Sequence, residues 1–129
     1  MIAIDTNILV RVFIDDLSIN QIKAARQLVK NAKEIFLSHI VIIEMVWVVL
    51  RAYKLTKEQV IMILQEIYEN AAFTVEYEEQ FINAFSLYKK HNIDFSDCFI
   101  LSAVKNANIP CLYTFDEKFS KIPRVKKLT

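Results

Sequence analysis

Four carboxylates stand where an α/β protein would use them for chemistry. Asp5 and Asp116 each follow directly on a short apolar run that predicts a β-strand. Asp97 lies in the first turn of a predicted helix, and Glu44 is the only charged residue within the apolar stretch 40–50. Ligands of parallel sheets bind beyond the carboxyl ends of the strands. We therefore expect these acids, which come from four distant segments, to converge at one edge of a sheet.

A cluster of carboxylates implies a cation. Like charges at close range raise the pKa of one or more acids unless a cation offsets them. Oxygen ligands suit Mg²⁺ or Mn²⁺ better than zinc, and neither His39 nor His91 stands at metal-ligand spacing. The chemistry most natural to such a site is metal-assisted hydrolysis of a phosphodiester, in which the metal activates water and offsets the charge on phosphate.

Each acid also has a structural interpretation. Asp5 could cap the turn after its strand, and Asp116 could start a short turn over residues 117–121. Asp97 could complement the dipole of its own helix. Glu44 is harder to explain in this way, because a carboxylate on so apolar a helix is costly to bury unless it is paired or binds a metal.

The elements that would position these acids alternate between strand and helix. Two capping-box spacings, Ser18 with Gln21 and Thr56 with Gln59, indicate helix starts. Alternating strands and helices imply right-handed parallel crossovers. We therefore predict a single α/β domain over residues 1–129, with three α/β/α layers around a central, mainly parallel sheet of four to five strands. The predicted strands are 2–4, 35–38, 73–75, 111–115 and 125–128, and the predicted helices start at 18, 40, 56 and 95, with one more around the apolar stripe Phe81, Ala84, Phe85 and Tyr88.

The amino-acid composition excludes several common phosphate-binding motifs. The 129 residues include no glycine, where average usage would give about nine. A Walker-type loop, a dinucleotide fingerprint and a serine-hydrolase elbow all need glycine, so none is present in standard form. The chain must therefore bind any phosphate with side chains, metals or non-glycine backbone. Asparagine is the next-best residue for a left-handed turn, and Asn92, Asn106 and Asn108 are available at the predicted turns.

Charge and cysteine usage are those of an ordinary soluble chain. The net charge is +1, but residues 117–129 carry +4 and residues 1–116 carry −3. The two cysteines, Cys98 and Cys111, do not make a disulfide framework, and we expect them to be reduced thiols. No stretch predicts a signal peptide or a membrane span. We expect a soluble cytoplasmic protein that does not act at a membrane.

The segments that carry the acids resemble the motifs of a known family. Residues 5–11, Asp-Thr-Asn-Ile-Leu-Val-Arg, look like the opening of PIN-domain ribonucleases, and most closely of the toxins of VapBC toxin–antitoxin pairs. Residues 38–50 are similar to the second motif of that family, 94–97 to the third and 114–119 to the fourth. Any one motif is weak, but the four occur in order and at separations similar to those of the family. The likeness runs from residue 1 to about residue 125.

The resemblance implies an endoribonuclease of single-stranded RNA that depends on one or two Mg²⁺ or Mn²⁺ ions. The positions that match the metal-binding acids of the family are Asp5, Glu44, Asp97 and Asp116. Asn7 matches a polar position that supports the first acid, and Thr114 matches a hydroxyl beside the last. Asp94 is expected in a capping or supporting role.

The sequence gives less direct evidence on which residues contact RNA or protein partners. Arg11, Lys118 and Lys121 could hold RNA phosphates near the acids, although a solvated surface would explain the basic tail equally well. The resemblance also implies a homodimer and an antitoxin protein that blocks the site. Three aromatic side chains could serve such interfaces or pack in the core: Trp47, Phe13 and Phe36.

Two alternative functions stay open at this point. One is an RNA-binding module that keeps the fold without catalysis, although the presence of all four acids argues against it. The other is a DNA-directed nuclease of the same fold.

Overall fold

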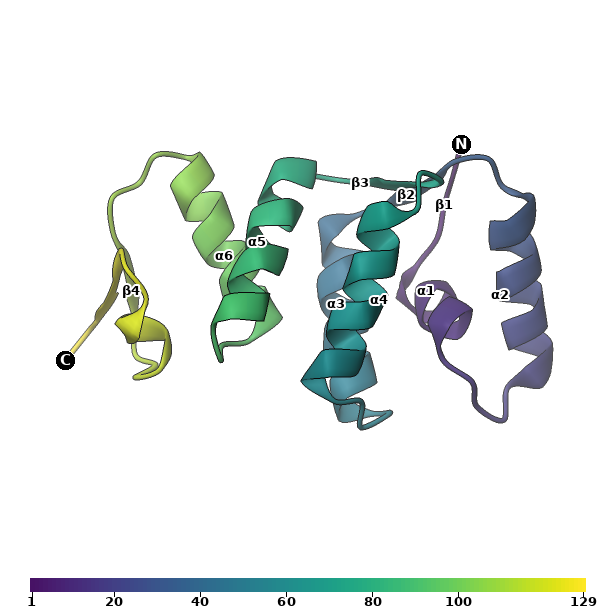
Figure 1. Cartoon of the computed structure of the whole chain (residues 1–129), viewed down its shortest axis with the longest axis horizontal. Helices are drawn as coiled ribbons and strands as arrows, with labels where there is room; N and C mark the ends of the chain where they lie inside the picture. The colour runs from purple at the N-terminus through teal and green to yellow at the C-terminus, as the bar shows by residue number, and fades with distance from the viewer. The chain divides into compact units, whose positions relative to one another are not determined.

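A computed structural model describes residues 1–129 of the protein. It contains six α-helices, five short strands and one 3-10 helix. The chain divides into two compact units, residues 1–76 and residues 77–129, and each unit is described by itself (Figure 1).

The first unit is built on a parallel sheet of three strands, in the order β1-β2-β3. Ile2 pairs with Ile35, and Ile35 pairs in turn with Phe73. Both end residues of the middle strand, Ile35 and Leu37, are fully buried, as expected where helices cover a parallel sheet. The elements in chain order are β1 (Ile2–Ala3), α1 (Thr6–Phe13), α2 (Ile19–Asn31), β2 (Ile35–Leu37), α3 (His39–Arg51), α4 (Lys57–Glu69) and β3 (Phe73–Val75).

The helices of the first unit pack as neighbours in a row. Helix α1 contacts both α2 and α3, and α3 lies beside α4 (Figure 1). The core contains Leu9 of α1, Ile42 and Met45 of α3 and Leu64 of α4, all with no exposed surface. These side chains recur at helical spacing, so each helix buries one face.

Side chains of small polar residues start three of these helices. Asp5 caps α1 and Ser38 caps α3, each by accepting a hydrogen bond from the backbone three residues on. The capping box predicted for Thr56 and Gln59 is confirmed at the start of α4. The box predicted at Ser18 is wrong, because that side chain makes no capping bond although α2 does begin there.

The second unit combines a helix pair with a two-stranded parallel sheet. Its elements are α5 (Glu78–Lys90), α6 (Phe95–Asn106), β4 (Leu112–Thr114), the 3-10 helix η1 (Phe119–Lys121) and β5 (Val125–Lys127). The predicted stripe of Phe81, Ala84, Phe85 and Tyr88 is confirmed as the buried face of α5. The rings of Tyr88 and Phe95 meet edge to face, with centroids 5.6 Å apart, and join α5 to α6.

One asparagine takes the turn position where glycine is commonest. Asn108 follows the end of α6 with φ of 60°. Its N–H donates to the carbonyl of Lys105 at 3.0 Å, and the N–H of Ile109 donates to Val104 at 3.1 Å. This is the Schellman arrangement of a helix end. Neither Asn92 nor Asn106, the other two asparagines available for such turns, has a positive φ.

The predicted α/β class and its parallel strands are confirmed. The strands form two sheets, however, where the sequence predicted one sheet of four to five strands. Strands β4 and β5 are joined only by residues 115–124 and pair with each other inside the second unit, with Leu112 N donating to Arg124 O at 2.8 Å. Helix α1 was not foreseen. That residues 1–129 act as a single domain stays a prediction.

Candidate functional site

The first unit places Asp5 at the end of a strand and at the mouth of a pocket. Its Oδ1 accepts a hydrogen bond from the backbone of Ile8 at 3.0 Å, so the carboxylate is held at the start of α1. Asp5 lines a pocket of about 500 Å³ between α1 and α2, together with Asn7 and Arg11. The first motif of the sequence therefore brings an acid, an amide and a guanidinium to one cavity.

The guanidinium of Arg11 is incompletely satisfied within this pocket. Nη1 contacts the carbonyl oxygen of Asn7 and Nη2 contacts Oγ of Ser18, both at 3.5 Å. Nε is buried and has no hydrogen-bond acceptor. Buried donors without acceptors are rare in folded proteins, so this one calls for an explanation.

The carboxyl ends of β2 and β3 are joined by a histidine and a glutamate. Oε1 of Glu76, which directly follows β3, lies 2.5 Å from Nδ1 of His39 and 3.2 Å from its backbone N. The ring hydrogen bond, followed by the backbone one, lowers the pKa of Glu76. The sequence did not predict His39 as a metal ligand, and it gave Glu76 no role in the site. The rule that ligands bind at the carboxyl ends of strands would have drawn attention to Glu76.

Glu44 lies in the second turn of α3, and its side chain is exposed. The argument that it must be costly to bury is therefore wrong. Helix α3 is apolar nearly all round, but its buried residues are Ile42, Met45, Val46 and Val49, and Glu44 lies on the opposite, exposed face. Its place in the second motif is now the reason to consider it functional.

The second unit positions Asp116 through Thr114. The backbone N of Asp116 donates to Oγ1 of Thr114 at 3.0 Å, and Oδ1 of Asp116 accepts from the backbone of Phe119 at 3.2 Å. Asp116 therefore starts the turn into η1, as its structural interpretation proposed. The same bonds orient its carboxylate just beyond the carboxyl end of β4.

Asp97 lies in the first turn of α6 and is half-buried. Burial raises its pKa, and the negative charges of Asp94 and Asp116 raise it further. Asp94 and Asp116 are thus near enough to Asp97 for their charges to disfavour its ionisation. Asp94 occupies the predicted N-cap position of α6, although its side chain makes no capping hydrogen bond.

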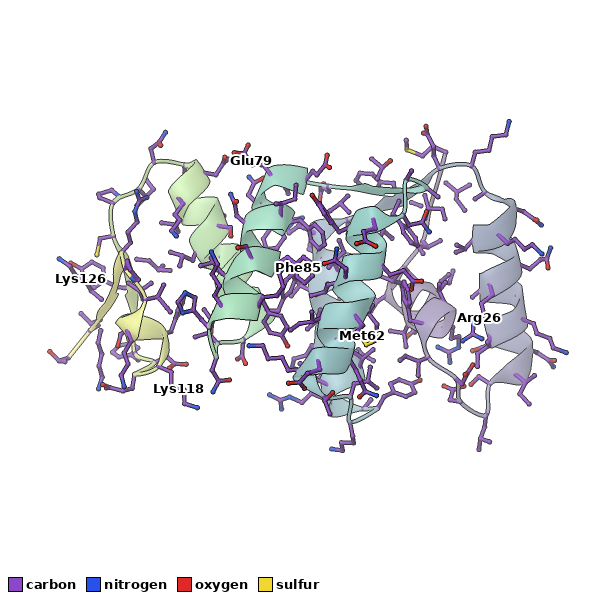
Figure 2. The ribbon with its side chains drawn as sticks, viewed as in Figure 1. Arg26, Met62, Glu79, Phe85, Lys118 and Lys126 are labelled. Atoms are coloured by element: carbon purple, nitrogen blue, oxygen red, sulfur yellow. The ribbon has the colours of Figure 1, made fainter.

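The basic tail is exposed around η1 and β5. Lys118 and Lys121 flank the turn that Asp116 begins, and Lys118 and Lys126 extend outward in Figure 2. Lys127 is engaged within the tail, because its Nζ pairs with Oε2 of Glu117 at 2.5 Å. The remaining cations are placed where an anionic ligand could reach them.

The donor set suits a hard divalent cation. All four predicted ligands are carboxylates, and oxygen-only sites favour Mg²⁺ or Mn²⁺. The crowding around Asp97 is of the kind that a cation relieves. Neither unit alone gathers three acidic, histidine or cysteine side chains closely enough to hold a metal. The residues therefore fit a cation by chemistry, and the assembled metal site stays a prediction.

The chain is similar to known proteins over most of its length. The sequence model of the PIN domain family matches residues 2–125, a span that includes all four acids. The chain belongs to the PIN domain family. A curated relative described as "VapC ribonuclease", from Aquifex aeolicus (strain VF5), is 27% identical over 96 residues, which are 74% of this chain and 71% of that relative. The family resemblance inferred from the motifs is thereby confirmed.

The structure also describes the helix lengths, the cysteines and the aromatic residues for which the sequence made predictions. No helix has the length and apolar character required to cross a bilayer. Neither Cys98, which is buried, nor Cys111, which is half-buried, is in a disulfide. Of the three aromatic candidates for interfaces, Trp47 is 59% exposed, and the guanidinium of Arg51 lies 5.3 Å from its ring. Phe13 and Phe36 are half-buried.

Proposed function

We propose that this PIN-domain protein is a divalent-metal-dependent endoribonuclease that hydrolyses phosphodiester bonds of single-stranded RNA, and that it is the toxin of a toxin–antitoxin pair. The family match over residues 2–125 carries this proposal, because it spans the four motifs in order. The Aquifex relative, described as a VapC ribonuclease, supports the ribonuclease and toxin assignments.

The proposed metal ligands are the four acids of the motifs, Asp5, Glu44, Asp97 and Asp116. Together they would hold one or two Mg²⁺ or Mn²⁺ ions. When bound, the cation would offset the charge that builds on the phosphate and lower the pKa of water. The pKa of Asp97 is raised by burial first and then by the negative charges of Asp94 and Asp116, and this combination supports the assignment.

Two neighbouring residues would act by positioning the acids. Thr114 accepts the backbone N–H of Asp116 and so sets the direction in which the chain leaves β4. Asn7 lies two residues after Asp5 and lines the same pocket. Asp94, whose charge acts on Asp97, would adjust how readily that acid ionises. Such supporting groups commonly change the activity or affinity of a metal site by about 10–100-fold.

Cationic side chains would bind the RNA backbone. Arg11 stands beside Asp5 in the first unit, and Lys118 and Lys121 stand beside Asp116 in the second. Each phosphate contact contributes affinity that weakens as salt rises. The chain as a whole carries only +1, so these local cations must supply the attraction that overall charge does not.

The proposal includes protein partners. A cognate antitoxin would block the site, and a second copy of the chain would form a homodimer. The exposed Trp47 supports an interface, because a large aromatic at the surface is typical of protein contacts. We further propose that residues 1–129 work as one domain and that the protein acts in the cytoplasm.

A direct assay tests the reaction class. The purified protein is offered single-stranded RNA and single-stranded DNA of the same sequence, with Mg²⁺, with Mn²⁺ and with chelator. We expect RNA cleavage that requires either metal and little cleavage of DNA. Binding of RNA without turnover at any metal concentration would instead identify a binding module. Preferential cleavage of DNA would identify a DNA-directed nuclease.

A further inference from the structure

The pocket between α1 and α2 has properties that a metal site alone does not require. Its volume, about 500 Å³, lies within the range of small-molecule sites. Polar groups from both helices line it, including Asn7 and Arg11 of α1 and Gln21 of α2. Apolar groups complete the wall, among them Ile8 and Leu28, and Leu28 is 42% exposed although it lies on the inner face of α2.

The contacts of Arg11 leave donors of its guanidinium available to a ligand in the pocket. Its buried Nε has no acceptor, and its two other contacts are at the long limit of hydrogen bonding. The two Nη groups, whose contacts are at that limit, can therefore donate to an acceptor that enters the pocket. Arginine suits the paired acceptors of a nucleobase edge or of a phosphate, because its N–H groups form a flat fork.

The rest of the lining distinguishes between these two ligands. Asn7 and Gln21 carry amides, each with donors and an acceptor, and such groups match base edges. The apolar side chains of Ile8 and Leu28 would cover the face of a ring but add nothing for a bare phosphate. We propose that this pocket binds a nucleobase of the RNA strand, next to the scissile phosphate at the proposed metal site of Asp5. The pocket would thereby contribute to the choice of cleavage site. This inference rests on the proposed function.

Gln21 is the best residue with which to test the pocket. It is exposed, it lies in the first turn of α2, and the proposed metal chemistry does not use it. Replacement by alanine removes the amide and leaves a good helix former. Gln27→Ala is the matched control, because Gln27 is an exposed glutamine of the same helix that does not line the pocket.

The first experiment measures binding of AMP, GMP, CMP and UMP to the full chain by NMR titration, without added metal. We expect at least one nucleotide to shift the resonances of Asn7, Gln21 and Leu28. Gln21→Ala should weaken that nucleotide roughly fivefold, the value of one neutral hydrogen bond, while Gln27→Ala leaves it unchanged. Absence of binding by all four nucleotides, or equal binding by wild type and Gln21→Ala, overturns the inference.

The second experiment sequences the products of a randomised single-stranded RNA pool. We expect Gln21→Ala to keep cleaving but to change the base preference on one side of the cut, while Gln27→Ala keeps the wild-type preference. Cleavage with unchanged preference in Gln21→Ala overturns the pocket assignment and leaves the proposed function standing. If the wild type cleaves no RNA, the proposed function fails, and the nucleotide titration alone then decides whether the pocket binds a base.

Discussion

Glu76, the residue after β3, accepts two hydrogen bonds from His39, the first residue of α3. One comes from the backbone N at 3.2 Å and the other from ring Nδ1 at 2.5 Å. Since an ionised carboxylate can only accept, the ring proton must be on Nδ1. The pair therefore ties the ends of two adjacent parallel strands, β2 and β3, through one carboxylate, and it lowers the pKa of Glu76.

The Glu76–His39 pair predicts how stability changes in acid. A carboxyl group whose pKa is depressed in the folded state stabilises the fold at pH values above its ordinary pKa of 4.5. This contribution is lost as the pH falls through the lower pKa of the folded state. Glu76→Gln should therefore lower the free energy of unfolding at neutral pH, and the difference from wild type should shrink as the pH falls below about 4. Urea unfolding of both proteins between neutral and acid pH measures this difference in free energy of unfolding. Glu34→Gln, at an exposed acid, is the control, and a difference that did not depend on pH would contradict the assignment.

A second pair anchors the loop that follows α1. The hydroxyl of Tyr53 donates to Oδ2 of Asp16 at 2.7 Å, while Oδ1 accepts from the backbone of Ser18 at 2.7 Å. The tyrosine bond is the main reason that the pKa of Asp16 is lowered. Tyr53→Phe should destabilise the protein at neutral pH and have little effect once Asp16 is protonated. The matched control is Tyr68→Phe, at an exposed tyrosine of α4. Equal unfolding midpoints for Tyr53→Phe and wild type at neutral pH would refute this role.

Thr114 is predicted to act on catalysis by holding Asp116. Thr114→Val removes the acceptor for the backbone N–H of Asp116 and should reduce RNA cleavage by about tenfold, within the range for groups that position metal ligands. Thr114→Ser keeps the hydroxyl and should restore most of the activity, which a purely packing role would not explain. Thr74→Val, at an exposed strand threonine, is the control. Equal losses in the serine and valine variants would contradict positioning by the hydroxyl.

Asn108 is predicted to matter for stability because of its backbone conformation. At φ of 60° a residue with Cβ is strained unless it is asparagine or aspartate. Asn108→Ala should therefore cost about 1 kcal/mol of unfolding free energy, whereas Asn108→Gly should be neutral or stabilising. Asn106→Ala, at the last residue of α6, should cause no loss. Thermal unfolding of the three variants measures this, and a fully stable Asn108→Ala would show that the turn can change conformation.

Local signals in the sequence predicted much of the fold. The spacing of Thr56 and Gln59 predicted the start of α4, and the stripe from Phe81 to Tyr88 predicted the buried face of α5. These features depend on residues three or four apart, which one sequence displays directly. The family was recognisable for a similar reason, because each motif is a short continuous segment.

Features that depend on long-range context were not predictable. Ser18 has the spacing of a capping box, but its hydroxyl contacts Arg11 instead, from a different helix. Tyr77 precedes α5 with φ of 52°, and an aromatic residue in a sequence gives no sign of such a left-handed conformation. Glu44 was expected to be buried because its neighbours are apolar, whereas its own position on α3 faces outward. The pocket that Gln21 lines could not be predicted from the sequence, because it forms only where α1 and α2 lie side by side.

Cleavage of single-stranded RNA by Asp5→Asn and Asp97→Asn, with Mg²⁺ present, tests the central claim most directly. Asparagine preserves the cap that Asp5 makes on α1, so loss of activity reports loss of charge and not loss of the helix. We predict that each variant folds like wild type by circular dichroism and cleaves at least about a hundredfold more slowly, while Asp15→Asn, at an exposed acid paired with Arg26, keeps full activity. Wild-type rates in both Asp5→Asn and Asp97→Asn would contradict the account.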